Sequence, residues 1–377
     1  MHIGYVKRII KKLIHKTEDK ILNNVNKTDY DKNCLLSYIT QPFIEGPNAD
    51  HQNQDQVIEI ARLIGNRGYN VDVIDFYAKK VNFDKKYDAL FEIHVRDNPV
   101  YKGYLKEDAV RIMYITGSNP RFANEQEKIR LSNLEMRRGK RLIPRRQATS
   151  FSDEIENFDE VIIIGNQVTY QSYAEYSFKK VAFVNNTGYD FDFGFNKQLK
   201  KSNAFLFFGS CGSVHKGLDL LLEVFSEKDF PCELYVCGGY LYEKDFYKAY
   251  KKELTKCDNI KACGFVNVNS DEFKALCDKC SFTILPSCAE GMAGTITTCM
   301  SAGVIPVCSR ECGVDEDDVI VLEDCTIETI REKVLELANM DIDKIEELSR
   351  KSIDLYHEKY NMNAFSRMMN KAISEVL

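Results

Sequence analysis

The feature that most constrains the fold is an alternation of short apolar runs and helical segments, which occurs twice along the chain. Strands of a first set are predicted at residues 35–39, 71–74, 89–94, 111–115, 161–164 and 181–184. Strands of a second set are predicted at residues 204–208, 233–237, 260–265, 281–285, 304–307 and 319–322. Strands separated by helices predict parallel sheets covered on both faces. We therefore expect an α/β protein with two doubly wound, Rossmann-like domains that face a central cleft.

The length of 377 residues suits two domains better than one hydrophobic core. A polar stretch at residues 195–202 separates the two sets of strands. The predicted boundaries are 1–33 for an N-terminal basic segment, 34–195 for the first domain, 196–360 for the second domain and 361–377 for a C-terminal helix packing back toward the first domain. In the first domain, Val57, Ile60, Ala61 and Ile64 predict a helix that ends by Gly68.

The net charge of −6 is divided unequally between the two halves of the chain. Residues 1–200 carry a balance of +4, and residues 201–377 carry a balance of −10. The first half is too weakly basic for a dedicated nucleic-acid-binding protein, so we exclude nucleic acid as a partner. The unequal charge instead predicts that the two halves of the chain face different partners or different electrostatic fields in solvent.

Thirteen cysteines raise the possibility of disulfides or a metal site. The odd number and the apolar surroundings favour small buried side chains in a reducing cytosol. Cys277 and Cys280 have the spacing of half a zinc site, but no second pair follows. Asp190 and Asp192 form a D-x-D sequence, for which turn or capping roles are favoured over a metal role. We expect no metal and no cofactor.

No stretch of the sequence approaches 18 uncharged apolar residues, so no membrane-spanning segment is predicted. Lysine and arginine residues interrupt the N-terminal apolar positions, which argues against a secretory signal. Residues 6–22 have the pattern of a basic amphipathic helix that lies on a membrane or packs on the protein itself. The expected location is cytoplasmic, with a possible peripheral position on the inner face of the membrane.

A glycine-rich loop follows the strand at 204–208 and leads directly into a helix. Its residues include Gly209, Ser210, Gly212 and Lys216. Glycines let backbone N–H groups approach an anion, a helix N-terminus adds partial positive charge, and a lysine adds a full charge. The loop is not a P-loop, because Lys216 precedes Gly217. Phosphate binding and a plain tight turn both fit this pattern.

A second loop follows the strand at 281–285 and contains an acid followed by small residues. Its candidate binding residues are Glu290, Gly291, Met292, Ala293, Gly294, Thr295 and Thr298. A carboxylate accepts hydrogen bonds from hydroxyls, and N–H groups at a helix start suit phosphate. A ligand that carries both hydroxyls and phosphates is therefore expected here.

Together these two loops resemble the second domain of family-4 retaining glycosyltransferases of the GT-B fold. The resemblance rests on Lys216-Gly-Leu-Asp-Leu-Leu-Leu-Glu and Leu285-Pro-Ser-x-x-Glu-Gly, about seventy residues apart and in the family's order. It extends more weakly over the first domain, through the loop after Ile39 and the segment from Gly68 to Val73. It covers nearly the whole chain from Cys34 onward.

The resemblance implies a nucleotide-sugar donor bound mainly to the second domain and an acceptor bound mainly to the first. Transfer would occur in the cleft, with retention at the anomeric carbon and without a metal. Lys216 would stabilise the leaving diphosphate, and Glu290 would hold sugar hydroxyls. His94, at the end of the strand 89–94, would contact the acceptor or the reacting sugar, although a partly buried structural histidine fits equally well.

Two positions depart from the family's pattern. The second glutamate of its Glu-x7-Glu sequence falls on Thr298, and an arginine that often precedes the lysine by five positions falls on Cys211. A hydroxyl at 298 would replace a carboxylate with a weaker hydrogen bond. The substitutions indicate either a variant subgroup or weaker donor binding.

Residues 121–146 hold nine basic residues and three acids. Asn124 and Glu127 are expected to form a capping box, and Gly139 is expected to end that helix. The segment is interpreted either as a solvated basic face or as a grip on the phosphate of a lipid-linked acceptor or an anionic membrane surface.

The function expected from the resemblance is transfer of a sugar to a glycan or lipid-linked acceptor in the synthesis of cell-surface polysaccharide or glycoconjugate. Two alternatives remain open. One is an inactive subunit that binds nucleotide sugars or glycans, and the other is an epimerase of nucleotide sugars on the same fold.

Overall fold

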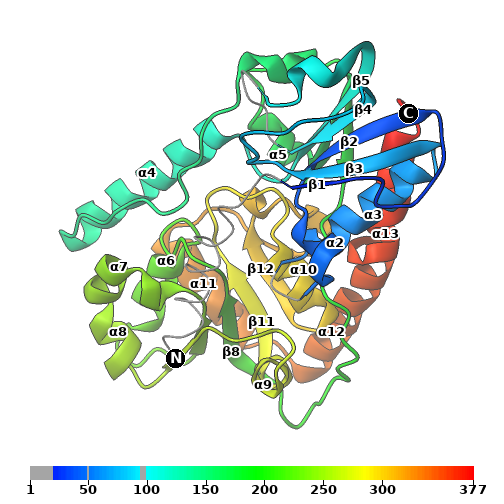
Figure 1. Ribbon diagram of the computed structural model, residues 1–377. Helices are drawn as coiled ribbons and strands as arrows, with labels where there is room; N and C mark the ends of the chain where they lie inside the picture. The colour runs from blue at the N-terminus through cyan, green and yellow to red at the C-terminus, as the bar shows by residue number, and fades with distance from the viewer. Residues whose placement is uncertain (1–19, 49–50, 94–98) are drawn as a thin grey trace.

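The computed structural model describes residues 20–48, 51–93 and 99–377. Within them the chain forms two sheets, one from each half of the sequence, with helices packed on them (Figure 1). The predicted α/β class with two doubly wound domains is confirmed. His94 and residues 1–19, which include most of the predicted basic helix, lie outside the described residues. Among the described helices, none has the length and apolarity needed to cross a membrane.

The first sheet has seven strands in the order β1-β3-β2-β4-β5-β6-β7, and every pair is parallel except β1 with β3. In chain order they are β1 (Ile21–Leu22), β2 (Lys32–Tyr38), β3 (Tyr69–Asp75), β4 (Tyr87–Glu92), β5 (Leu105–Ile115), β6 (Glu160–Ile164) and β7 (Val181–Val184). Leu36 of β2 lies opposite Val73 on one side and Phe91 on the other, and all three are fully buried. Burial of the central strands explains their continuous apolar runs.

Strand β1 corrects the prediction for the N-terminal segment. Ile21 and Leu22 were expected on the apolar face of a helix over residues 6–22. Instead they pair antiparallel with Ile74 and Val73 at the edge of the first sheet. The expected helix therefore does not extend over these two residues.

Helices and helical turns connect the strands of the first sheet. They are α2 (Gln41–Glu45), α3 (Asn53–Gly65), η1 (Lys102–Tyr104), α4 (Pro120–Arg138), η2 (Asp153–Asn157) and α5 (Gln167–Gln171). In α3 the predicted apolar positions Val57, Ile60 and Ile64 are all fully buried. The turn after α3 passes through Gly68 at φ +86°, a left-handed conformation that favours glycine.

The second sheet has six parallel strands in the order β10-β9-β8-β11-β12-β13. They are β8 (Lys201–Phe208), β9 (Glu233–Cys237), β10 (Ile260–Gly264), β11 (Cys280–Leu285), β12 (Ile305–Ser309) and β13 (Ile320–Leu322). Phe205 of β8 lies opposite Phe282 of β11, and their rings stack with centroids 5.2 Å apart. Because β8 and β11 are adjacent and parallel, the loops that follow them begin side by side at one edge of the sheet.

The connections of the second sheet are again helical. They are α6 (Leu218–Phe225), η3 (Tyr240–Tyr242), α7 (Lys244–Ala249), α8 (Lys251–Lys256), α9 (Asp271–Lys279), α10 (Gly294–Ser301), η4 (Arg310–Cys312), η5 (Glu316–Asp318) and α11 (Ile327–Ala338). The thirteen cysteines all fall within the described residues, and each is a free thiol. Cys277 and Cys280 are buried, and burial raises the pKa of both thiols. They pack as the small apolar side chains that the sequence predicted.

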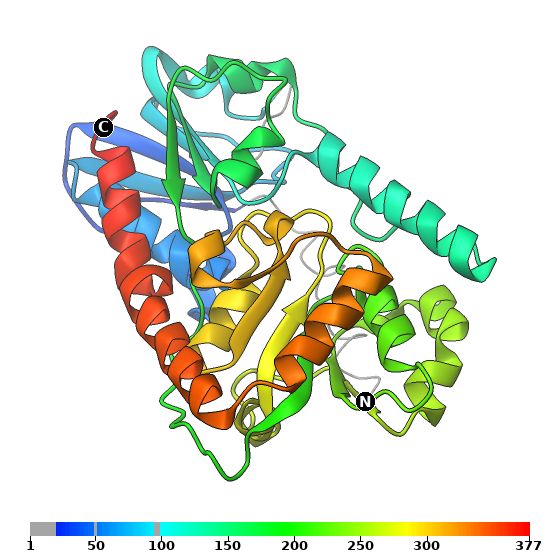
Figure 2. The same cartoon turned by 180° about the vertical axis from the view of Figure 1, so that it is seen from behind.

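The last helices run from the second domain back to the first (Figures 1 and 2). Helix α12 (Ile342–Leu355) packs on α10 and β12, a π-helical turn η6 (Tyr356–Tyr360) follows, and α13 (Met362–Ile373) packs on α3 and β7. The side chain of Asn361 caps α13 by accepting a 2.8 Å hydrogen bond from the N–H of Ala364. Arg67 donates to the side chain of Asn370 at 3.0 Å, so α13 is also tied to the first domain by polar contacts.

Helix α4 and the segment after it, residues 120–148, form what we call the arm. It leaves the first domain and lies over helices α6, α7 and α8 of the second (Figures 1 and 2). Arg137 lies 2.8 Å from Asp219 and 3.0 Å from Glu223, both on α6. Arg138 lies 2.8 Å from Glu253 on α8. These ion pairs join the basic first half of the chain to the acidic second half.

The arm continues to contact the second domain beyond its helix. Arg145 forms an ion pair with Asp245, which also accepts a 2.8 Å hydrogen bond from the N–H of Ile143. Within the helix, Arg130 donates to the carbonyl of Pro286 at 3.0 Å. Much of the basic segment expected to face solvent or a lipid phosphate is therefore occupied by the second domain.

The ends of α4 are only partly as predicted. Asn119 caps the helix by accepting a 2.8 Å hydrogen bond from the N–H of Arg121, and Gly139 ends it at φ +62°. The role of Gly139 is confirmed. The capping box of Asn124 and Glu127 is wrong, because both residues lie inside the helix.

We predict that Arg137→Ala lowers the free energy of unfolding by about 1–3 kcal/mol. Asp219 is fully buried, and burial raises its pKa to about 6 even though Arg130 and Arg137 lower it. Removing Arg137 leaves this carboxylate with less compensation. Urea unfolding at pH 7 measures the change.

The matched control is Arg121→Ala, which breaks an exposed ion pair with Glu175 inside the first domain. An exposed pair contributes less than about 1 kcal/mol. If both substitutions lowered the free energy of unfolding equally, the contact of the arm with α6 would not stabilise the protein more than an exposed ion pair does.

Candidate active site

The loops after β8 and β11 pack directly against each other. Gly217, which precedes α6, has φ +74°. A Cβ atom at this position would lie 2.4 Å from the carbonyl oxygen of Pro286 in the other loop. Glycine at 217 therefore permits both the left-handed backbone and the close approach of the two loops.

Lys216 and Glu290, the two charged residues predicted for the site, form a buried ion pair. The Nζ atom of Lys216 donates to Oε1 of Glu290 at 2.5 Å, and the two side chains are 6% and 11% exposed. The hydroxyl of Ser287 donates to the same carboxylate oxygen at 2.9 Å. A cation and an acceptor of hydroxyl hydrogen bonds thus lie together at the edge of the second sheet.

The surroundings hold Glu290 in its charged form. Burial raises the pKa of this carboxyl, but the positive charges of Lys216 and Arg146 and the hydrogen bond from Lys216 outweigh burial. The resulting pKa is about 2. Glu290 is therefore ionised at neutral pH and acts as a hydrogen-bond acceptor rather than as an acid.

His215 joins the two loops, and its role was not foreseen from the sequence. Its Nε2 atom donates to the carbonyl of Ala289 at 2.5 Å, and its own carbonyl accepts a 2.9 Å hydrogen bond from the N–H of Cys288. The ring is 2% exposed, and burial lowers its pKa. A neutral ring protonated on Nε2 fits this environment.

The glycine-rich loop already holds an anion from the protein itself. Glu243, which immediately precedes α7, accepts hydrogen bonds from the N–H of Gly212 at 2.6 Å and of Ser213 at 3.1 Å. The loop therefore has the anion-binding geometry expected from its glycines, but a carboxylate occupies these two N–H groups. Gly212 was predicted to bind a donor, and the contact of Glu243 with this loop was not foreseen.

The other residues predicted in this loop lie around Lys216. A Cβ atom on Gly209 would lie 3.2 Å from Cδ of Lys216, so glycine leaves room for the lysine stem. Ser210 and Cys211 are exposed. Donor binding by Gly209, Ser210 and Gly212 stays a prediction.

The first domain contacts the backbone of the loop that carries Glu290. The hydroxyl of Ser118 donates to the carbonyl of Glu290, and the hydroxyl of Thr169 donates to the carbonyl of Gly291 at 3.1 Å. Asn186 donates to the carbonyl of Met292 at 2.8 Å. The first domain thus faces the same loop that presents the predicted donor contacts.

Two N–H groups of this loop are already used within the second domain. Those of Glu290 and Ala293 each donate at 2.9 Å, to the carbonyls of Glu311 and Cys312 respectively. The N–H of Ala293 is therefore not available to a phosphate, and donor binding by residues 291–295 stays a prediction. Gly294 and Thr295, at the start of α10, are half-buried, whereas Gly291, Met292 and Ala293 are buried.

Comparison with known proteins finds a match in the second domain. Residues 202–340 match the family model described as glycosyl transferases group 1. The matched residues run from β8 to α11. A comparison of the sequence with curated proteins finds no significant match.

Solved structures with the GT-B fold resemble this chain over most of its length. HepE of Anabaena, in complex with UDP and glucose, is 12% identical with a TM-score of 0.56, over 92% of this chain and all of HepE. Sucrose-phosphate synthase of Thermosynechococcus elongatus is 11% identical with a TM-score of 0.57, over 92% of this chain and 99% of the synthase. TarM of S. aureus is 14% identical with a TM-score of 0.53, over 76% of this chain. This chain spans about half of TarM, 54% of its length.

Thr298, where the family's second glutamate was expected, contacts the first domain. It is 1% exposed, and its hydroxyl oxygen lies 3.3 Å from Nε2 of Gln52, which also donates to the carbonyl of Gly294. Thr298 therefore contributes to the contact between the domains. Donor binding by Thr298 stays a prediction.

The D-x-D sequence lies in the connection between the two sheets. Asp190 accepts a 2.7 Å hydrogen bond from the hydroxyl of Tyr356 in η6. This contact links the connection to the C-terminal helices, which fits the structural role favoured for Asp190.

We predict that Glu290→Gln destabilises the protein at pH 7 and that the difference from the unchanged protein shrinks as the pH falls from about 5 towards 2. The pKa of Glu290 is lowered from 4.5 to about 2, so its stabilising effect is complete above pH 4.5 and is lost as the pH falls through the folded pKa. The pKa change corresponds to about 3 kcal/mol. Urea unfolding of both proteins over this pH range measures it.

Glu125→Gln is the control, because Glu125 is exposed and 3.7 Å from an exposed Lys128. Its difference from the unchanged protein should stay small at every pH. A destabilisation by Glu290→Gln that does not vary with pH would show that the carboxylate is not held ionised by Lys216.

Proposed function

We propose that the protein transfers a sugar from a nucleotide-sugar donor to a glycan or lipid-linked acceptor with retention of anomeric configuration, in the synthesis of cell-surface polysaccharide or glycoconjugate. The observation that carries this proposal is the buried contact of Lys216 with Glu290 at the edge of the second sheet. The ammonium matches a leaving diphosphate, and the carboxylate matches sugar hydroxyls. Both functions are needed at neighbouring positions when a nucleotide sugar is the donor.

In this proposal Lys216 and Glu290 give up their contact with each other when the donor binds. Lys216 then contacts the diphosphate, and Glu290 contacts the sugar. Lys216 and Glu290 neutralise each other's charge. A diphosphate carries more negative charge than one carboxylate, so it competes with Glu290 for Lys216. Glu290 then becomes free to accept hydrogen bonds from the sugar.

The first domain supplies the acceptor side in this proposal. Ser118 and Thr169 already reach the backbone of residues 290 and 291, so an acceptor held by the first domain lies near the donor sugar. Lys216 provides positive charge at the leaving group, and we propose that the reaction proceeds without a bound metal. The free cysteines favour a reducing cytoplasm as the location.

The test is a transfer and hydrolysis assay with a panel of nucleotide sugars. UDP-glucose comes first, because HepE was solved with UDP and glucose. We expect Lys216→Ala to lower kcat by about 100-fold or more, because the lysine acts on charge that develops at the leaving group. Glu290→Gln should raise KM for the donor and also lower kcat.

Lys197→Ala is the control, since Lys197 pairs with exposed Asp343 away from the two loops, and it should leave both constants unchanged. Nuclear magnetic resonance of the first product should show the donor's anomeric configuration. Binding without turnover would support an inactive subunit, and formation of an epimerised nucleotide sugar without an acceptor would support an epimerase. Either result would reject the proposed transfer.

We also propose that the protein lies at the surface of an anionic membrane. The contacts would come from residues 7–22 and from the tip of the arm at Lys140 and Arg141. Lys140 and Arg141 at the tip are exposed, and so are the neighbouring apolar side chains Met136 and Ile143. Exposed basic and apolar side chains together suit an anionic lipid surface.

We expect the double substitution Lys140→Glu and Arg141→Glu to reduce co-sedimentation with phosphatidylglycerol vesicles several-fold, by reversing the charge near the lipid. Lys228→Glu on the second domain, where Lys228 is 92% exposed, is the matched control. Unchanged co-sedimentation of the double variant would reject a membrane contact through the arm.

A further inference from the structure

Arg146, at the end of the arm, lies against the glycine-rich loop of the second domain. Its Cγ and Cδ atoms are 2.6 and 2.9 Å from the place that a Cβ atom on Gly212 would occupy. Any larger side chain at 212 would displace the arginine stem. Gly212 therefore lets a residue of the first domain reach the loop that carries Lys216.

Buried Glu127 fixes the position of this arginine. Its carboxylate accepts hydrogen bonds from the N–H of Arg145 at 2.7 Å and of Arg146 at 3.0 Å, and from the side chain of Gln147 at 2.8 Å. Glu127 is 1% exposed and lies on α4. The carboxylate expected to cap a helix instead holds three consecutive residues of the returning segment in place.

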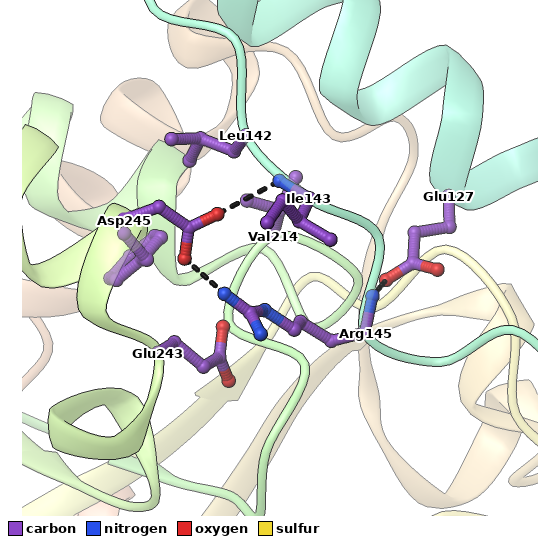
Figure 3. A pocket seen from close by; sticks show the side chains of 8 residues that line it. Glu127, Leu142, Ile143, Arg145, Val214, Glu243 and Asp245 are labelled. Atoms are coloured by element: carbon purple, nitrogen blue, oxygen red, sulfur yellow. Dashed lines mark hydrogen bonds and ion pairs between the residues drawn. The ribbon is translucent and has the colours of Figure 1, made fainter.

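Contacts with the second domain hold the same segment from the other side. Figure 3 shows the side chain of Arg145 directed toward Asp245 and Glu243, with the carboxylate of Glu127 beside the backbone nitrogen of Arg145. These residues line a small cavity. The cavity has a volume of 10 Å³, about enough for one water molecule. Glu243 lines this cavity and also accepts a hydrogen bond from the N–H of Gly212 in the glycine-rich loop. The cavity beside Arg145 and the glycine-rich loop therefore share one residue.

The guanidinium of Arg146 differs from those of three other arginines on the arm. Arg137, Arg138 and Arg145 are each paired with a carboxylate of the second domain. Among the residues that the structure describes, the guanidinium of Arg146 has neither a hydrogen bond nor an ion pair, and the residue is exposed. Its charge nevertheless acts on Glu290 and His215, since it contributes to lowering the pKa of both.

We infer that Arg146 binds the diphosphate of the donor together with Lys216, and so provides from the first domain the cation that Cys211 does not provide in the second. The inference rests on the proposed function and extends it to a residue outside the matched domain. A guanidinium binds phosphate oxygens through two parallel N–H bonds, whereas an ammonium acts as a point charge. The donor would then contact both domains, and binding would favour the position of the arm over the second domain.

The experiment measures dissociation constants by calorimetry for UDP, ADP and GDP and for the matching nucleosides. For the diphosphate that binds best, we expect Arg146→Ala to weaken binding by about 10- to 100-fold, as expected for loss of a charged hydrogen bond. Affinity for the nucleoside should change little. Arg141→Ala, which removes an exposed arginine from the same arm, is the control and should leave the diphosphate affinity unchanged.

A rescue variant separates a direct contact from a structural effect. Adding Cys211→Arg to Arg146→Ala returns an arginine to the family's position, and we expect it to recover most of the lost diphosphate affinity. The thermal unfolding temperature of Arg146→Ala should equal that of the unchanged protein, because only the backbone N–H of Arg146 is bonded to Glu127.

Diphosphate affinity that is equal in Arg146→Ala and Arg141→Ala, while Lys216→Ala loses it, would overturn this inference and leave the proposed function intact. Equal weakening of nucleoside and diphosphate binding by Arg146→Ala would also overturn it. Failure of the unchanged protein to bind any nucleoside diphosphate would overturn the proposed function, and the inference with it.

Discussion

The contact between the basic arm and the acidic surface of the second domain determines how the two halves of this protein meet. Arg137 bonds to Asp219, which is buried in the first turn of α6 and lies three residues after Lys216. The arm therefore contacts α6, the helix that begins two residues after Lys216. The ion pairs of Arg137, Arg138 and Arg145 place basic residues of the first half of the chain against acidic residues of the second half.

From this contact follows the arrangement of the site. One side is the edge of the second sheet, where Lys216 and Glu290 meet because β8 and β11 are neighbours. The other side is the first domain, whose Ser118 bonds to the carbonyl of Glu290. Both domains therefore contribute to one small polar region, which suits a donor that joins a charged nucleotide to a neutral sugar.

The sequence predicted those features that depend on local patterns. Strand and helix positions follow from apolar periodicity, and the residues of the two loops identified Lys216 and Glu290. The contact between these two side chains was not predicted, because it depends on β8 and β11 being neighbours in the sheet. The sequence did not reveal the hydrogen bonds of Glu243 to the glycine-rich loop or those of Glu127 to residues 145–147. Polar contacts between distant segments leave no periodic signal in the sequence. Arg146 was counted among the basic residues, but its approach to Gly212 depends on how the domains pack.

The central claim is that a nucleotide sugar binds between the domains by taking the places that Lys216 and Glu290 hold for each other. The most direct measurement is a crystal structure of the protein with an intact nucleotide sugar. We predict diphosphate oxygens bonded to Nζ of Lys216, sugar hydroxyls bonded to Glu290, and a longer separation between these two side chains than 2.5 Å. A donor bound elsewhere, with the ion pair of Lys216 and Glu290 unchanged, would contradict it.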